Sequence, residues 1–228
     1  MTAAPLHFRN ERLMLDPSGA AFWPAKRVLI ISDLNFENAD SAIAVVPPHG
    51  AHAGLERLTR LVRLYRPSKL IVLGRIFSDG GSSARSAKDD RARIDAIGRE
   101  AQIIWVAGGH DVAPANLPGQ RVVEHREGPF VFRYRAMARL APREIEVSGY
   151  FRPKASIESR AKRIARPCFV TDPNRLILPA FGSSTGALDV RDPAIAKLFP
   201  RGLRVFLLGQ EQLYSFALEQ LGRLAEVA

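Results

Sequence analysis

Three polar positions stand directly after apolar runs of the sequence, where strands would end and a ligand could bind. Asp33 follows RVLIIS, Arg75 follows KLIVLG, and His110 with Asp111 follows QIIWVAGG. Brought together, a carboxylate, a guanidinium and an imidazole could hold an anion such as phosphate, because arginine presents a planar fork of donors. Histidine could also transfer a proton near neutral pH. A lone Asp after a strand is more often a helix cap or a turn residue, and a lone His is more often structural, so this chemistry requires that they meet.

The apolar runs themselves predict the elements that would bring these residues together. They are rich in β-branched residues, as strands covered on both faces are, and predict buried strands at 27–32, 69–74 and 102–107. Helical patterns lie between them, at 54–67 and 84–99. The order β-α-β-α-β predicts a parallel sheet, whose ligands bind beyond the carboxyl ends of the strands. Asp33, Arg75 and His110 are therefore expected at one edge.

The second half of the chain predicts a different arrangement. Short strand-like runs separated by turn residues occur at 131–135, 144–149, 168–170, 175–180, 204–209 and 213–218. Such a series is typical of mostly antiparallel pairing, in a second sheet packed against the first. The stretch SGYFRP would bring Tyr150 and Arg152 to the same edge as Asp33. We expect one domain spanning residues 1–228.

The charge of the chain favours polyanions such as DNA as partners. Its formal net charge is +10 and its pI about 10.4. The densest basic stretch, residues 152–167, has six basic residues against Glu158 alone. The residues in it that would contact nucleic acid are Lys154, Arg160, Lys162, Arg163 and Arg166. A solvated hairpin or loop remains the alternative interpretation of this stretch.

Other features limit the compartment and the chemistry. A single cysteine, Cys168, excludes an internal disulfide and a thiolate metal cluster. No apolar run is long enough to cross a bilayer, and no secretory leader pattern opens the chain. We therefore expect a cytoplasmic protein without a membrane partner, while the sequence does not predict its oligomeric state.

The chain resembles the calcineurin-like metallophosphoesterase superfamily, and within it the ligase-associated DNA-repair endonuclease group of bacteria. The resemblance rests on the order and spacing of SDLN, VLGRIF, GGHD, SGYFRP, RPCFV and LPAFGSSTGALDV. It implies the α/β class, with a four-layer α/β/β/α sandwich of mixed parallel and antiparallel sheets. It also implies two divalent metals such as manganese, which polarise the phosphate and activate water.

Carried over position by position, the resemblance retains little of the metal site. Asp33 alone keeps the ligand type of the family. Other residue types stand at the remaining ligand positions, which are Asn35, Arg75, Gly109, Tyr134, Tyr150 and Arg152. His110 and Asp111 keep the family's non-ligand pair, which stabilises the transition state or protonates the leaving oxygen.

Electrostatics predicts the consequence for the metals. Arginine cannot lose its proton, and Arg75 and Arg152 would stand where dications should bind. At about 4 Å and an effective dielectric near 20, each unit-charge contact amounts to about 4 kcal/mol. We therefore expect no metal cofactor.

Two functions follow from these residues. The first is a degenerate metallophosphoesterase-fold protein, catalytically inactive or impaired, which binds DNA, another polyanion or DNA-repair proteins. In it Arg75 and Arg152 would form an anion site, or Arg75 would only pair with Asp33 in a relic pocket. The alternative is an active metal-dependent phosphodiesterase or DNA endonuclease with a rearranged site that uses His110. Whether the chain is an enzyme stays open at this point.

Overall fold

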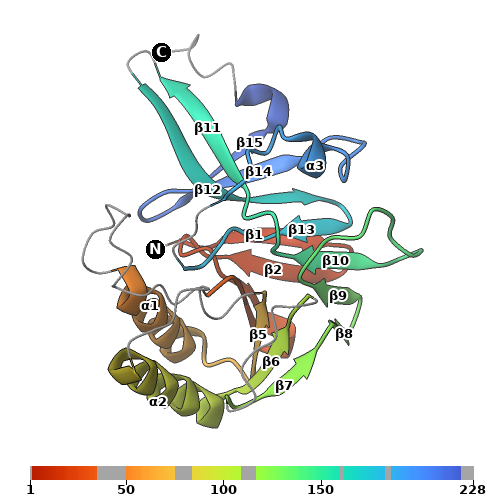
Figure 1. Cartoon of the computed structure of the whole chain (residues 1–228). Coiled ribbons are helices and arrows are strands. Elements are labelled where there is room, and N and C mark those ends of the chain that lie inside the picture. The colour runs from red at the N-terminus through yellow and green to blue at the C-terminus, as the bar shows by residue number, and fades with distance from the viewer. Residues whose placement is uncertain are drawn as a thin grey trace.

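The structure is a computed structural model that describes residues 2–34, 50–74, 84–108, 117–159, 162–182 and 186–221. Within these ranges, the backbone alone is described at 50–53, 84–88, 157–159 and 162–164. Two sheets pack face to face, and two helices cover the outer face of one of them (Figure 1).

The first sheet is built around the three strands predicted from the apolar runs. Its order is β1-β2-β3-β4-β5-β6-β7, antiparallel from β1 to β4 and parallel from β4 to β7. The bounds are Ala4–Phe8, Glu11–Leu15, Ala21–Trp23, Val28–Ser32, Lys69–Leu73, Gln102–Val106 and Gln120–Val122. The strands predicted at 27–32, 69–74 and 102–107 are confirmed as β4, β5 and β6. The outer strands β1, β2, β3 and β7 were not predicted, because they are short and carry polar residues.

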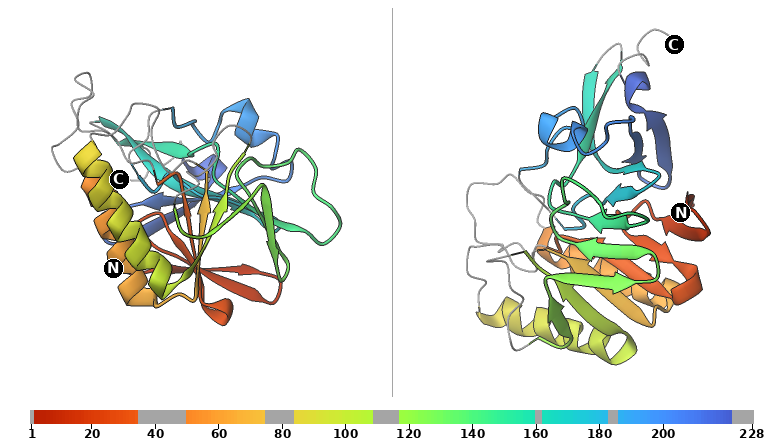
Figure 2. Two further views of the ribbon diagram at one scale, coloured as in Figure 1. Left: turned by 60° about the horizontal axis from the view of Figure 1, so that its bottom comes forward. Right: turned by 90° about the vertical axis from the view of Figure 1, so that its right-hand side faces the viewer.

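The two predicted helices are confirmed as α1 (Gly50–Tyr65) and α2 (Ala84–Glu100). They lie side by side on one face of the first sheet (Figure 2). Alternate residues of the central strands explain why this sheet is covered on both faces. In β4, Leu29 and Ile31 pack under the helices, while Val28 and Ile30 face the second sheet.

The second sheet has the order β15-β14-β12-β13-β10-β9-β8, with β11 paired to β12. The bounds of β8 to β15 are Glu124–Glu127, Phe130–Arg133, Ile145–Ser148, Lys154–Ser159, Lys162–Asp172, Arg175–Ile177, Arg204–Leu208 and Leu213–Ala217. Most pairs are antiparallel, but β9, β10 and β13 run parallel to one another. The apolar runs predicted β9, β10, β12, β13, β14 and β15 but neither β8 nor β11. The expectation of mostly antiparallel pairing did not include the parallel strands β9, β10 and β13, because strand direction depends on how the connecting loops return. The parallel trio brings three carboxyl ends to one edge.

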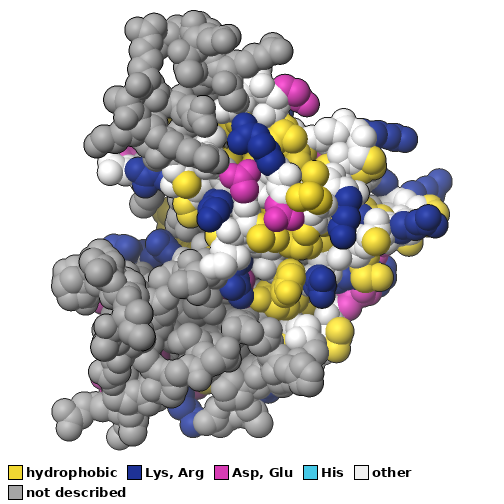
Figure 3. Space-filling model, turned by 45° about the horizontal axis from the view of Figure 1, so that its top comes forward, with side chains coloured by type: hydrophobic (Ala, Val, Ile, Leu, Met, Phe, Trp, Pro, Cys, Tyr) yellow, Lys and Arg dark blue, Asp and Glu magenta, His cyan; other side chains and the backbone are white. Residues whose placement is uncertain are grey.

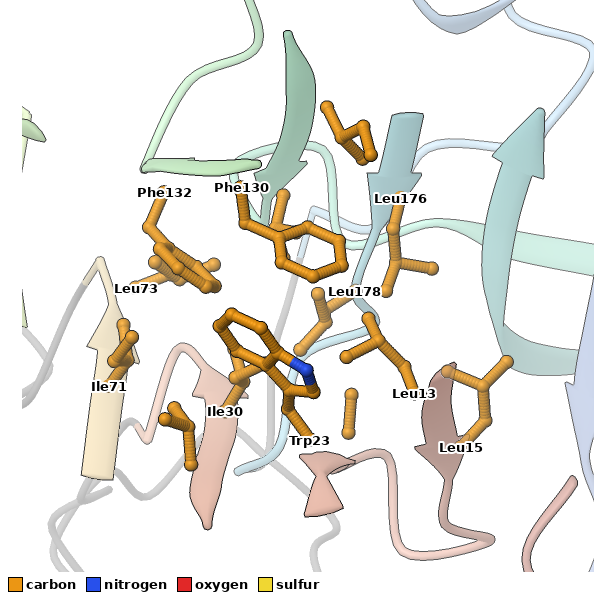
Figure 4. Close-up of a cluster of buried hydrophobic side chains, with 14 of the residues drawn as sticks. Leu13, Leu15, Trp23, Ile30, Ile71, Leu73, Phe130, Phe132, Leu176 and Leu178 are labelled. Atoms are coloured by element: carbon orange, nitrogen blue, oxygen red, sulfur yellow. The ribbon is translucent and has the colours of Figure 1, made fainter. Parts of the chain in front are cut away.

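The main core fills the space between the sheets. Trp23 lies at its centre, with its ring 4.9 Å from that of Phe130 and at 75° to it (Figure 4). Its indole nitrogen donates to Glu11 Oε2 at 2.8 Å, so the one polar atom of this buried side chain is satisfied. Leu73, Phe132 and Leu178 pack around the same ring system, so both sheets contribute to one core (Figure 4).

The outer face of the second sheet carries little helix in the part of the chain that is described. Within the described ranges, the second half of the chain has one turn of helix, α3 (Pro193–Ala196), and one 3-10 turn, η2 (Leu218–Gln220). Another 3-10 turn, η1 (Pro24–Lys26), connects β3 to β4 in the first sheet. Asp192 caps α3 by accepting from Ala194 N at 2.7 Å. The α/β class and the sandwich of two mixed sheets are thus confirmed, with a fourth layer built mostly of loops.

The basic stretch forms a hairpin. Strand β11 pairs with the first half of β12, and the two strands extend away from the sandwich (Figure 1). Among the described residues, no helix is both long and apolar enough to span a membrane.

Candidate functional site

The carboxyl ends of strands from both sheets meet at one edge of the sandwich. Backbone hydrogen bonds join them there: Phe181 N donates to Ser32 O at 2.7 Å, and Gly182 N donates to Asp33 O at 2.9 Å. On the side of the second sheet, Gly149 N donates to Tyr134 O at 3.1 Å. Residues that follow β4, β9, β10 and β13 are therefore held against one another by main-chain contacts.

An ion pair stands at the centre of this edge. Arg152 Nε donates to Asp33 Oδ2 at 2.6 Å, and Arg152 Nη2 donates to the Tyr134 hydroxyl at 3.1 Å. The Asp33 side chain is completely buried, and that of Arg152 is 17% exposed. A charge-assisted hydrogen bond of this length, between a buried carboxylate and an arginine that reaches solvent, fixes the guanidinium in place.

The protonation of these groups follows from their surroundings. Burial alone would lower the pKa of Arg152, but the hydrogen bond and charge of Asp33 outweigh it and raise that pKa. Burial and then the negative charge of Asp33 raise the pKa of Tyr134 well above its usual value. Near neutral pH the site therefore holds a carboxylate, a guanidinium and a neutral phenol.

The ring of Tyr134 fills the space beyond the two neighbouring strands. A Cβ atom on Gly74 would lie 2.1 Å from Tyr134 Cε2, and one on Gly108 would lie 3.2 Å from Tyr134 Cδ1. Gly74 also has a φ of +89°, which favours glycine. The tyrosine thus packs directly on the backbone where β5 and β6 end, and both glycines make room for it.

Four of the residues predicted for the site are brought together here. They are Asp33, Tyr134, Tyr150 and Arg152, with the rings of the two tyrosines 5.4 Å apart and nearly perpendicular. Asn35, Arg75, Gly109, His110 and Asp111 lie outside the described residues, and their roles stay predictions.

The residues predicted to contact nucleic acid lie on the hairpin or beside it in the sequence. Half-buried Lys154 opens β11, exposed Arg166 is on β12, and Lys162 and Arg163 belong to β12 by backbone position. Arg160 lies outside the described residues.

Two arginines near the site were missed by the sequence reasoning. The guanidinium of Arg135 lies over the ring of Tyr150, 4.8 Å from its centroid. Arg57, on α1, lies 4.4 Å from the ring centroid of Phe181 and donates to the carbonyl of the same residue. Burial, and then the charge of Arg60, lowers the pKa of Arg57. Neither residue follows a strand of the parallel sheet, so no positional signal pointed to them.

The described part of the donor set does not fit the two metals that the family resemblance implies. Asp33 is the only metal-binding side chain type among the four residues assembled here, and its carboxylate is held by a guanidinium at 2.6 Å. No group of three His, Cys, Asp or Glu side chains that could hold a metal occurs within the described ranges. The bulk of Tyr134 also occupies the ends of β5 and β6. The site instead holds the guanidinium of Arg152, fixed by its carboxylate partner Asp33.

The fold and this edge define a two-sheet α/β sandwich with a polar site at the strand ends. A solved structure with the same fold is that of Pseudomonas putida nuclease MPE, with a TM-score of 0.75 and 24% sequence identity. The match covers 94% of this chain and 100% of the nuclease. No protein-family model and no curated protein matches the chain. The two chains therefore share a fold, while membership of the metallophosphoesterase superfamily and of its ligase-associated group stays a prediction.

Proposed function

We propose that this protein binds the phosphodiester backbone of DNA at the Asp33–Arg152 edge and has no dinuclear metal centre, so that it binds without hydrolysing. The observation that carries the proposal is the 2.6 Å contact between Arg152 Nε and Asp33 Oδ2. This contact places the permanently charged guanidinium of Arg152 beside Asp33, the one residue that keeps the ligand type of the family pattern. The positive charge that metals supply in the family would here be supplied by arginine.

The surroundings of the site support a polyanionic ligand. The hairpin begins two residues after Arg152, and it carries Lys154, Lys162, Arg163 and Arg166. Lys and Arg side chains lie at several places across the face in Figure 3, with hydrophobic side chains and some Asp and Glu side chains between them. With a net charge of +10, such a surface attracts nucleic acid through counterion release. The resemblance to the ligase-associated group favours a cytoplasmic role in DNA repair.

Metal content and turnover test the first half of the proposal. The purified protein is incubated with manganese, dialysed and analysed by mass spectrometry, alongside hydrolysis of a chromogenic phosphodiester. We expect near-zero bound metal and no turnover. About two metals per chain together with turnover would refute the proposal and support an active phosphodiesterase that uses His110.

DNA binding by matched variants tests the second half. Arg152→Gln should weaken DNA binding about tenfold or more, since hydrogen bonds to charged groups contribute about 1.5–3 kcal/mol. Arg204→Gln removes the same charge from an exposed residue of β14 that donates to Ser215 Oγ, and should change the affinity much less. Arg152→Lys keeps the charge and shows whether the planar fork is needed. Equal losses for Arg152→Gln and Arg204→Gln would mean that only overall charge matters.

A further inference from the structure

An aromatic side chain stands exposed at the mouth of the site. Tyr150 follows β10 and lies two residues before Arg152, and 40% of its surface is exposed. Its backbone N donates to Tyr134 O at 2.9 Å, which ties it to the same turn as the ion pair. The ring is thus beside the proposed phosphate site and open to solvent.

The ring is nevertheless held in place. Tyr134 and Phe151 pack at right angles to it, with each centroid 5.4 Å away and interplanar angles of 81° and 79°. The guanidinium of Arg135 lies over it at 4.8 Å. An exposed ring fixed by three neighbours loses little conformational freedom when a ligand stacks on it.

Hydrogen bonds to two buried carboxylates hold the loop that carries Arg135 in place. Glu146, which is 1% exposed, accepts from Met137 N at 2.9 Å and from Arg133 Nη1 at 3.0 Å. Glu144 accepts from Ala141 N at 2.8 Å and from Arg133 Nη2 at 2.6 Å. The loop at 134–144 therefore presents Arg135 and the half-exposed Met137 from a rigid base.

We propose that Tyr150 and Arg135 form a stacking site for one unpaired nucleobase of the strand whose phosphate is bound at Arg152. The inference rests on the proposed function and adds to it the residues that recognise the base. Aromatic rings and guanidinium planes both stack on bases, and every base offers a π face. Inside a duplex these faces are covered by neighbouring bases. The site should therefore accept bases that are unpaired, whatever their identity.

The test uses a short single strand with one 2-aminopurine, whose fluorescence falls when it stacks. The full-length wild-type protein should quench the fluorescence, and Tyr150→Phe should retain this effect. Tyr150→Leu should abolish the quenching and weaken binding about 5- to 150-fold, the range expected when one base–aromatic stack is removed. Arg135→Gln should weaken binding in the same direction.

Matched controls separate the stacking site from general binding. Tyr214→Leu removes a comparably exposed tyrosine, 46% exposed and on β15, and should leave quenching and affinity unchanged. A fully abasic strand of the same length, which offers phosphates but no base to stack, should bind wild type and Tyr150→Leu equally. Thermal melting checks that each variant is folded.

The outcomes distinguish this inference from the proposed function. If DNA binding depends on Arg152 but Tyr150→Leu changes neither affinity nor quenching, the stacking site is wrong and the proposed function stands. If no oligonucleotide binds the wild-type protein, both proposals fall.

Discussion

At the scale of single residues, both members of the central ion pair have unusual backbone conformations. Asp33 has a φ of 44° and Arg152 a φ of 48°, in the left-handed region that residues with side chains rarely adopt. Such conformations carry strain and persist where surrounding contacts enforce them. Here the main-chain bonds of Asp33 N to Leu73 O at 2.9 Å and of Arg152 N to Gly149 O at 3.1 Å do so. The two side chains are thereby directed at each other.

At Gly149 the end of β10 lies tightly against Ser32 of the first sheet. A Cβ atom there would lie 1.8 Å from Ser32 Oγ and 2.5 Å from Ser32 Cβ. We predict that Gly149→Ala destabilises the protein by about 1–3 kcal/mol or more, because a packed core cannot absorb the extra methyl group. Chemical unfolding measures the change.

Gly54→Ala is the matched control for that substitution. A Cβ on Gly54 would meet ordinary contacts, 3.7 Å from Leu34 O, and alanine favours the helix α1 in which it lies. This variant should be unchanged or more stable by up to about 1 kcal/mol. A Gly149→Ala protein as stable as wild type would mean that the sheet ends can separate freely.

The raised pKa of Tyr134 predicts how stability changes in alkali. Because burial and Asp33 raise this pKa in the folded protein, the unfolded chain loses the phenolic proton first, near pH 10. Between about pH 10 and the higher folded pKa, the folded state binds more protons and stability falls as pH rises. Tyr134→Phe should lose less stability than wild type between pH 9 and 11, as measured by denaturant unfolding. Parallel pH profiles for the two proteins would contradict this cause.

At the scale of elements, the hairpin of β11 and β12 is the part of the molecule most suited to follow a DNA backbone. We predict that changing Arg160, Lys162 and Arg163 to Gln lowers the salt dependence of DNA binding. The slope of log affinity against log salt should fall by roughly 0.7–0.9 for each phosphate that the variant no longer neutralises. Filter binding or fluorescence anisotropy at several salt concentrations measures it.

A triple substitution on α2 provides the comparison for the hairpin. Arg91, Arg93 and Arg99 carry the same total charge, and the side chains of Arg91 and Arg93 are 47% and 40% exposed. Their change to Gln should leave the slope nearly as in wild type. If the hairpin variant shows an unchanged slope, the hairpin of β11 and β12 does not contact DNA and is a solvated structural element.

At the scale of the whole molecule, the shared core predicts that the chain unfolds as one unit. Trp23 reports on the core between the sheets, and Trp105 on the core between the first sheet and the helices. Both cores use alternate residues of the same strands, so neither sheet can melt alone. We predict coincident transitions by tryptophan fluorescence and far-UV circular dichroism, consistent with one domain over residues 1–228. Two separated transitions would indicate two folding units.

The sequence by itself determined the local elements and the edge at which they end. The apolar runs of β4, β5 and β6 predicted buried parallel strands, because β-branched composition and length are local properties. The polarity of parallel strands then predicted Asp33, Arg75 and His110 at one edge, and the stretch SGYFRP was expected to add Tyr150 and Arg152 there.

Only the tertiary structure decided which of these residues touch. The partners Asp33 and Arg152 are 119 positions apart in the chain. Arg75 lies outside the described residues, so its pairing with Asp33 stays a prediction. Three further features depend on how the two sheets pack. They are the parallel direction of β9, β10 and β13, the ring of Tyr134 over Gly74 and Gly108, and the guanidinium of Arg135 over Tyr150. Such contacts arise from the packing of distant side chains, which no local pattern of residues encodes.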